Sequence, residues 1–147
     1  MKTKKEKSQK FYVLLQMQKS KLSYYMHLKD ESFDSLIMEH LDVHCKTILS
    51  DYKSIKIGDE VKVVFRVEPY LKDEKCDPKA FGYLLRENKQ YCFHVCIPDD
   101  FLQRVDFILN RGLLPYFYLS CEKENYKHAD IKIFSLESEV VLEDYIS

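Results

Sequence analysis

The sequence lacks tryptophan and has only three glycines and four prolines. Because glycine and proline mark most turns and linkers, their scarcity argues against long flexible segments. No apolar run approaches the roughly 18 residues of a membrane-spanning helix. No apolar segment follows the N-terminal lysines, as it would in a secretory signal. We therefore expect a cytoplasmic protein that makes no membrane contact.

Signatures of common enzyme classes are also missing. Gly58, Gly82 and Gly112 are isolated, so no glycine-rich loop is available to bind phosphate. The acidic pairs Asp59-Glu60 and Asp99-Asp100 are explained by a turn and a helix cap. The sequence therefore predicts no catalytic residue and no cofactor, and it favours a protein that is not an enzyme.

Charge and cysteine content set further limits. The net charge is −1, but residues 1–10 hold five lysines and one glutamate, a charge of +4, so the remainder carries −5. This distribution predicts a lysine-rich flexible tail at 1–10 and a body that does not attract polyanions. The five cysteines lack the spacing of a disulfide scaffold, so we expect reduced thiols.

The length of 147 residues and the 14% aromatic content predict one β-rich α+β domain, over 11–139. In the second half, alternating apolar residues predict strands at 81–86, 91–97, 114–121 and 129–136. The first two strands form a hairpin through 87–90, with Arg86 opposite Tyr91. A helix is predicted from its cap, Asp99 or Asp100, to its stop at Gly112.

The first half is predicted to follow the same plan. A hairpin of 11–18 and 22–29 turns at 19–21, and apolar residues at helical spacing predict a helix at about 31–41. Strands are predicted from about 43 and at 61–67. A linker at 70–80 separates the halves, and 140–147 is an acidic-hydrophobic segment that either docks on the body or serves as a docking tail.

This order of elements recurs at 11–69 and 81–138. It predicts two ββαββ-like halves with one helix each, in a mainly antiparallel sheet or barrel. Either a true internal duplication or two ordinary modules of this kind would give the pattern.

Cys92-x-His94-x-Cys96 is the first candidate metal or thiol site. Cys92 and Cys96 would lie roughly 13 Å apart on a strand, too far for one ion to bridge. Cys92 and His94 could contribute together, with help from a residue elsewhere such as Cys121 or His128. The competing interpretation is that these cysteines are small buried hydrophobic residues.

His40 and His44 are the second candidate pair. On a helix they would lie one turn apart, a spacing that chelates metals. This needs a helix that continues through His44, where strand-like alternation competes, and no acidic third ligand is evident. His40 is more simply explained as a helix-surface residue.

Lys62, Arg66 and Lys132 are the candidate nucleic-acid contacts, because basic side chains on a sheet can meet phosphates while aromatic residues stack on bases. The alternative is a solvated outer face. The leading hypothesis is instead a non-enzymatic module that binds another protein, of the inhibitor, immunity or adaptor type. Nucleic-acid binding and the Cys92-His94-Cys96 site are its alternatives.

Overall fold

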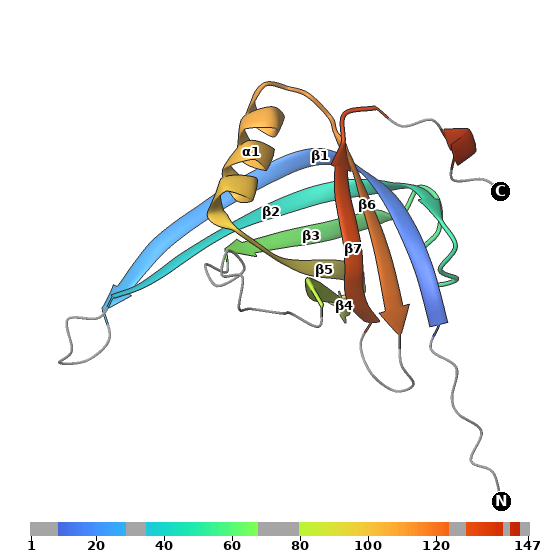
Figure 1. The fold of residues 1–147 in the computed structure, drawn as a ribbon, viewed down its shortest axis with the longest axis horizontal. Coiled ribbons are helices and arrows are strands. Elements are labelled where there is room, and N and C mark those ends of the chain that lie inside the picture. The colour runs from blue at the N-terminus through green and yellow to red at the C-terminus, as the bar shows by residue number, and fades with distance from the viewer. Residues whose placement is uncertain (1–8, 29–34, 68–79, 124–128, 140–141, 145–147) are drawn as a thin grey trace, which may run out of the picture.

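Seven strands close into a barrel in the computed structural model of the chain, which describes residues 9–28, 35–67, 80–123, 129–139 and 142–144 (Figure 1). Around the barrel the order is β1-β2-β3-β5-β4-β7-β6. The pairing of β3 with β5 is parallel, and the other described pairings are antiparallel. The expected barrel-like, mainly antiparallel α+β fold is thereby confirmed. The elements are β1 (Gln9–Leu28), β2 (Ser35–Ser50), β3 (Glu60–Val67), β4 (Gly82–Glu87), β5 (Gln90–Ile97), α1 (Asp99–Asn110), β6 (Tyr116–Lys123), β7 (Ala129–Glu137) and the short 3-10 helix η2 (Leu142–Asp144).

Alternate strand residues fill the barrel interior. Val63 and Phe65 of β3 pair with Phe93 and Val95 of β5, and all four are fully buried. The Phe65 ring meets Phe117 of β6 edge to face, with centroids 5.2 Å apart. Because side chains alternate along a strand, the residues between these ones point outward and form the outer surface of the barrel.

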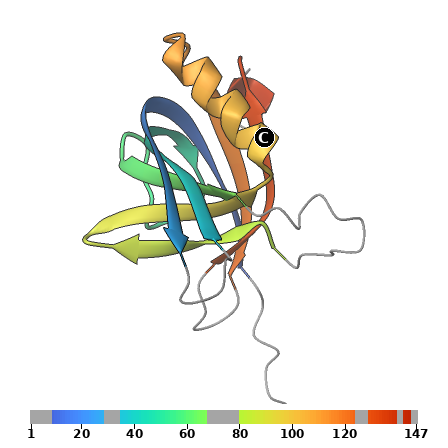
Figure 2. The ribbon, with the colours of Figure 1, turned by 90° about the vertical axis from the view of Figure 1, so that its left-hand side faces the viewer.

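The helix α1 lies above the strands (Figure 2) and contributes Leu102 and Val105 to the core. Its predicted position is confirmed, but the predicted cap is wrong. The N-cap is Pro98, with no side-chain cap hydrogen bond, and Asp99 and Asp100 lie in the first turn. The positive end of the helix dipole still stabilises the negative charge of Asp100 there. The predicted stop is confirmed, since Gly112 has a φ of 75°. None of the described helices is long and apolar enough to cross a membrane.

The hairpin of β4 and β5 has the predicted register, with Arg86 opposite Tyr91. It is longer than expected, because Glu87 pairs with Gln90 and the turn is only Asn88-Lys89. Both turn residues have positive φ, 47° and 67°, as in the tight turns whose twist matches the flanking strands.

The predicted hairpin of 11–18 and 22–29 is wrong, because β1 runs unbroken through the expected turn at 19–21. Its pairing with β2 shifts register between Met17 and Lys19. Such a bulge adds one residue and changes which face the following side chains take. In the sequence, this change in which alternate residues are apolar was interpreted as the turn of a hairpin. The resulting two-stranded ribbon projects beyond the other strands (Figure 1).

The predicted helix at 31–41 is also wrong across 35–41, which belong to β2. Leu41, Val43 and Cys45 alternate inward along this strand and are buried. From His40 to Lys46, β2 pairs with β1 on one side and β3 on the other. Hydrogen bonding on both edges and burial of the alternating face outweigh local helical spacing, since short helices gain most of their stability from packing.

The two halves therefore differ at the position of the predicted first helix, and the arrangement of one helix in each half is not found in the described residues. The strands predicted from 43 and at 61–67 are confirmed as β2 and β3. Gln9 and Lys10, assigned to the tail, pair with β6. Most of the tail and of the 70–80 linker lies outside the described residues. Within the segment 140–147, only η2 is described.

Candidate functional site

Most of the sequence candidates lie on one surface, which we call the outer wall. It consists of the side chains of β2, β3, β5 and β4 that face away from the core. Strand register arranges them in three cross-strand rows, which are His44-Lys62-Cys92-Leu85, Asp42-Val64-His94-Tyr83 and His40-Arg66-Cys96. Candidates far apart in the sequence are therefore neighbours in the sheet.

The three basic candidates do not form one surface. Lys62 and Arg66 project from β3, but Lys132 is on β7, and β5 and β4 lie between these strands in the barrel. The Lys62 Nζ lies 3.4 Å from Asp42 Oδ2. Since this carboxylate already neutralises one of the cations, the outer wall offers little excess positive charge for a nucleic acid.

Glu87, Cys92 and His94 form the tightest group of metal-ligating side chains among the described residues. One donor atom from each, namely a carboxylate oxygen, the thiol sulfur and a ring nitrogen, lies within 4.8 Å of the other two. The sequence had indicated Cys92 and His94, whereas Glu87 was assigned to the loop. Extending the predicted register by one pair places Glu87 on the same face as Cys92, so the signal was present.

His94 is held from several sides although it faces outward. Its ring stacks on Tyr83, with centroids 5.1 Å apart and planes 24° apart. Its Nε2 lies 2.9 Å from Glu87 Oε1, whereas the buried Nδ1 has no hydrogen-bond partner among the described atoms. The residue is only 7% exposed. Burial of a histidine with one unpartnered nitrogen is costly, which singles out this position.

Within this group, burial, followed by the nearby Glu87 carboxylate, raises the pKa of Cys92 to about 11, so its thiol is neutral at neutral pH.

The remaining cysteine candidates are not part of this group. Cys96 lies four residues further along β5 in another row. Cys121 is buried in the core, where burial raises its pKa to about 12. His128 lies outside the described residues. Cys45, Cys92 and Cys121 are free thiols.

His40 and His44 both lie on β2, not on a helix. Four strand residues span roughly 13 Å, so the two imidazoles cannot chelate one ion. Instead, His40 Nε2 lies 4.0 Å from Asp42 Oδ1. The hypothesis of a histidine pair on one helix face is therefore wrong.

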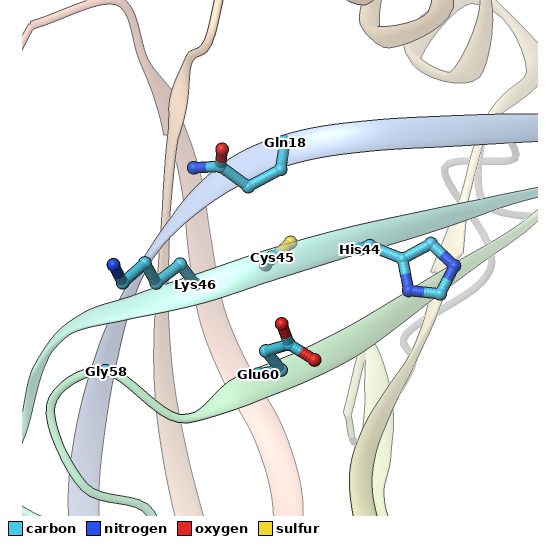
Figure 3. A pocket seen from close by; sticks show the side chains of 6 residues that line it. All are labelled: Gln18, His44, Cys45, Lys46, Gly58 and Glu60. Atoms are coloured by element: carbon cyan, nitrogen blue, oxygen red, sulfur yellow. The ribbon is translucent and has the colours of Figure 1, made fainter.

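A surface pocket of about 480 Å³ lies where β1, β2 and the start of β3 approach one another (Figure 3). Its lining is Gln18, His44, Cys45, Lys46, Gly58 and Glu60. The charged side chains carry both signs, and the Cys45 thiol is buried, with its Sγ 3.8 Å from the Val43 carbonyl oxygen. Burial raises the pKa of Cys45 far above its ordinary value. The pocket therefore offers no activated nucleophile.

An exposed aromatic side chain marks the outer face of α1. Phe107 is 60% exposed. Arg104 and Arg111 precede and follow it by three and four residues, a spacing that puts all three on one side of the helix. The Arg111 guanidinium carbon lies 4.9 Å from the centre of the Phe107 ring. We call Arg104, Phe107 and Arg111 the helix patch.

The comparisons with known proteins found no match, whether among family models, curated proteins or solved structures. The case for function therefore rests on the side chains themselves.

Proposed function

We propose that the protein is a non-enzymatic binding module that recognises another protein through the helix patch. The observation that carries this proposal is the exposure of Phe107 between Arg104, on α1, and Arg111, the residue that caps its C-terminal end. The proposed partner is a folded protein with an apolar spot bordered by acidic side chains. This chain would act on that partner as an inhibitor, immunity or adaptor protein.

Packing of α1 does not account for Phe107. The opposite face of the helix already supplies the buried residues Leu102 and Val105. A phenylalanine that leaves most of its surface in water gains little stability for the fold and retains apolar area for a partner. Leu113 and Leu114, directly after the helix, are exposed as well.

The residue types fit a protein interface. Aromatic residues and arginine are enriched at the centres of interfaces, where a few of them supply most of the binding energy. Arg111 over the Phe107 ring restricts both side chains before binding, which lowers the entropy lost in the complex. Two arginines beside the ring would favour a partner with carboxylates at matching positions.

The proposed compartment is the cytoplasm, and the free thiols of Cys45, Cys92 and Cys121 support it. Nucleic-acid binding through Lys62, Arg66 and the lysine tail is the alternative proposal. It is less well supported, because Asp42 neutralises Lys62.

Comparative capture tests the proposal. The tagged full chain, Phe107→Ala and Ile57→Ala are each exposed to nuclease-treated lysate of the native host, and bound proteins are quantified by mass spectrometry. Ile57 is a matched control, because it is a 68% exposed apolar residue in the loop between β2 and β3. We expect a stoichiometric protein whose recovery falls at least about tenfold with Phe107→Ala, as for an interface hot spot, and is unchanged with Ile57→Ala.

Three outcomes would contradict the helix patch. They are equal recovery with Phe107→Ala, an equal loss with both variants, and the absence of any stoichiometric protein. Recovery of nucleic acid before nuclease treatment, reduced by removal of residues 1–10, would instead favour the alternative.

A further inference from the structure

We propose that Glu87, Cys92 and His94 bind a divalent metal ion, with Zn²⁺ as the expected ion. Their donor atoms lie within 4.8 Å of one another on the outer wall. Three protein ligands, with the fourth position left to water, are the ligand number of zinc sites that stay open to exchange. The site lies on the β4–β5 hairpin, away from the helix patch, and does not depend on the proposed function.

The backbone of the hairpin brings these ligands together. Cys92 and His94 are two residues apart on β5 and therefore share a face. Glu87 ends β4, where it pairs with Gln90 across the two-residue turn. Its side chain reaches back along the same face to the ring of His94. A tight turn therefore places the third ligand, without contributions from distant segments.

The environment of His94 favours a ligand at this position. The ring is fixed by Tyr83 and by the 2.9 Å contact of Nε2 with Glu87 Oε1. Nδ1 is buried and unpartnered among the described atoms. Among the described atoms the two ring nitrogens have no hydrogen-bond partner other than Glu87, so either of them is available to a metal ion. Stacking on Tyr83 would hold the ring in the orientation that binding requires.

The distances allow an ion to bind after small side-chain movements. Zinc binds thiolate sulfur at ~2.3 Å and imidazole nitrogen or carboxylate oxygen at ~2.0–2.2 Å. Donors around one tetrahedral ion are therefore about 3.3–3.7 Å apart. Donor atoms up to 4.8 Å apart would move together, whereas Glu87 Oε1 and His94 Nε2, which lie 2.9 Å apart, would separate slightly. Both changes need side-chain adjustments of about 1 Å, to which the exposed Glu87 side chain can contribute.

The donor chemistry selects the class of ion. A thiolate and an imidazole favour zinc and similar transition metals over Mg²⁺ and Ca²⁺, which prefer oxygen ligands. When the sulfur–metal bond forms, the Cys92 proton passes to solvent. One thiolate and one carboxylate then balance the two charges of the ion. Lys62, beside Cys92 in the register, is paired with Asp42 and adds little repulsion.

The site is open to solvent on the Glu87 side, whose side chain is 49% exposed, so an ion can enter without unfolding of the hairpin. Cys96 is left out of the site because it lies four residues from Cys92 on β5, roughly 13 Å along the strand, on the side of His94 away from Cys92. This separation supplies a matched control, because Cys92 and Cys96 are thiols on the same face of the same strand.

Cobalt spectroscopy with the full chain, reduced and stripped of metal, tests the proposal. We expect one equivalent of Co²⁺ to give a thiolate-to-cobalt charge-transfer band in the near ultraviolet, and one equivalent of Zn²⁺ to abolish it. Cys92→Ser should eliminate the band, whereas Cys96→Ser should leave it unchanged. Circular dichroism of each variant reports whether it folds.

Glu87→Gln keeps the test decisive if Cys92→Ser fails to fold, because Glu87 lies at the surface. We expect this variant to bind Zn²⁺ at least about tenfold more weakly, the size of effect seen when metal-site residues are altered. Glu60→Gln, at an exposed position on β3, is the control and should not change affinity. The proposal is overturned if no stoichiometric band forms, if Cys96→Ser removes it, or if both glutamine variants bind as tightly as the wild type.

Discussion

The inner and outer faces of β5 carry different kinds of residue, although both are largely shielded from water. The inner face presents Phe93, Val95 and Ile97, all fully buried in the core. The outer face presents Cys92 and His94. These two residues are also buried, but by neighbouring side chains of the outer wall and not in the interior of the barrel. Because successive side chains alternate, a single strand contributes to the core on one face and presents the proposed metal ligands on the other.

The same contrast holds for α1. Its inner face supplies Leu102 and Val105 to the core, and its outer face exposes Phe107 between two arginines. Stability therefore depends on residues that point inward, and recognition is proposed for residues that point outward. Substitutions on opposite faces of the same element are the direct way to test this division.

The largest expected effect on stability is that of Phe93→Ala. Removal of a fully buried ring leaves a cavity in the barrel, which costs about 3–5 kcal/mol of unfolding free energy. Urea denaturation followed by circular dichroism measures it. A loss below about 1 kcal/mol would show that the inner face of β5 does not support the fold as described.

Gly82→Ala tests how closely the backbone of β4 approaches the backbone of β5. Gly82 has a φ of 145°, and an added Cβ would lie 1.8 Å from the backbone oxygen of His94. Backbone strain of this kind costs about 1–3 kcal/mol, and the clash must also be relieved by separation of β4 from β5. The same denaturation experiment should show this loss. Gly58→Ala is the control, because Gly58 also has a positive φ but no heavy atom would lie within 4 Å of the added Cβ. Equal losses for both variants would contradict the close approach at Gly82.

For the Cys92 thiol we expect a smaller effect on stability, one that depends on pH. Its pKa is raised from 9.0 to about 11 in the folded chain, chiefly by burial. Below about pH 9 the thiol is neutral in both states, and its contribution to stability is fully present. As the pH rises towards 11, the unfolded chain loses this proton more readily, so stability falls. We expect the wild type to lose more stability over this interval than Cys92→Ser, as measured by urea denaturation at each pH.

The alkaline comparison must be made between these two proteins, because Cys45 and Cys121 also have raised pKa values. Parallel stability curves for the wild type and Cys92→Ser between pH 8 and 11 would contradict the burial of Cys92 on the outer wall.

The smallest expected effect on stability is that of Phe107→Ala. This side chain is mostly exposed, and its contact with Arg111, which the substitution removes, is worth about 0.5–1 kcal/mol. The same Phe to Ala change therefore separates the inner position, 93, from the outer one, 107. A loss above about 2 kcal/mol at Phe107 would place this residue among the packing residues and remove the main support for the helix patch.

The sequence was sufficient for the second half of the fold because its local signals agree with its tertiary contacts. Alternation on both sides of Asn88-Lys89 indicated the hairpin, and apolar spacing before Gly112 indicated α1. In the first half the signals conflict. A bulge near Gln18 changes the phase of β1, and the helical spacing before Leu41 lies in a strand that is paired on both edges from His40.

The site was predicted only in part for a related reason. Cys92 and His94 were recognisable as neighbours on one strand face. Glu87 was missed because the hairpin loop was taken as four residues instead of two. Phe107 was missed because the apolar face of the helix was already complete without it. Neither the three rows of the outer wall nor the parallel pairing of β3 with β5 follows from local sequence.

Site-specific photo-crosslinking from position 107 is the most direct test of the claim that the outer face of α1 recognises a partner. The full chain would carry a photoreactive phenylalanine analogue at position 107 or, as the control, at position 57, and would be irradiated in the native host. We predict that one predominant protein is crosslinked from position 107 and that this protein is not crosslinked from position 57. The same products from both positions, or no product from position 107, would contradict the proposed function.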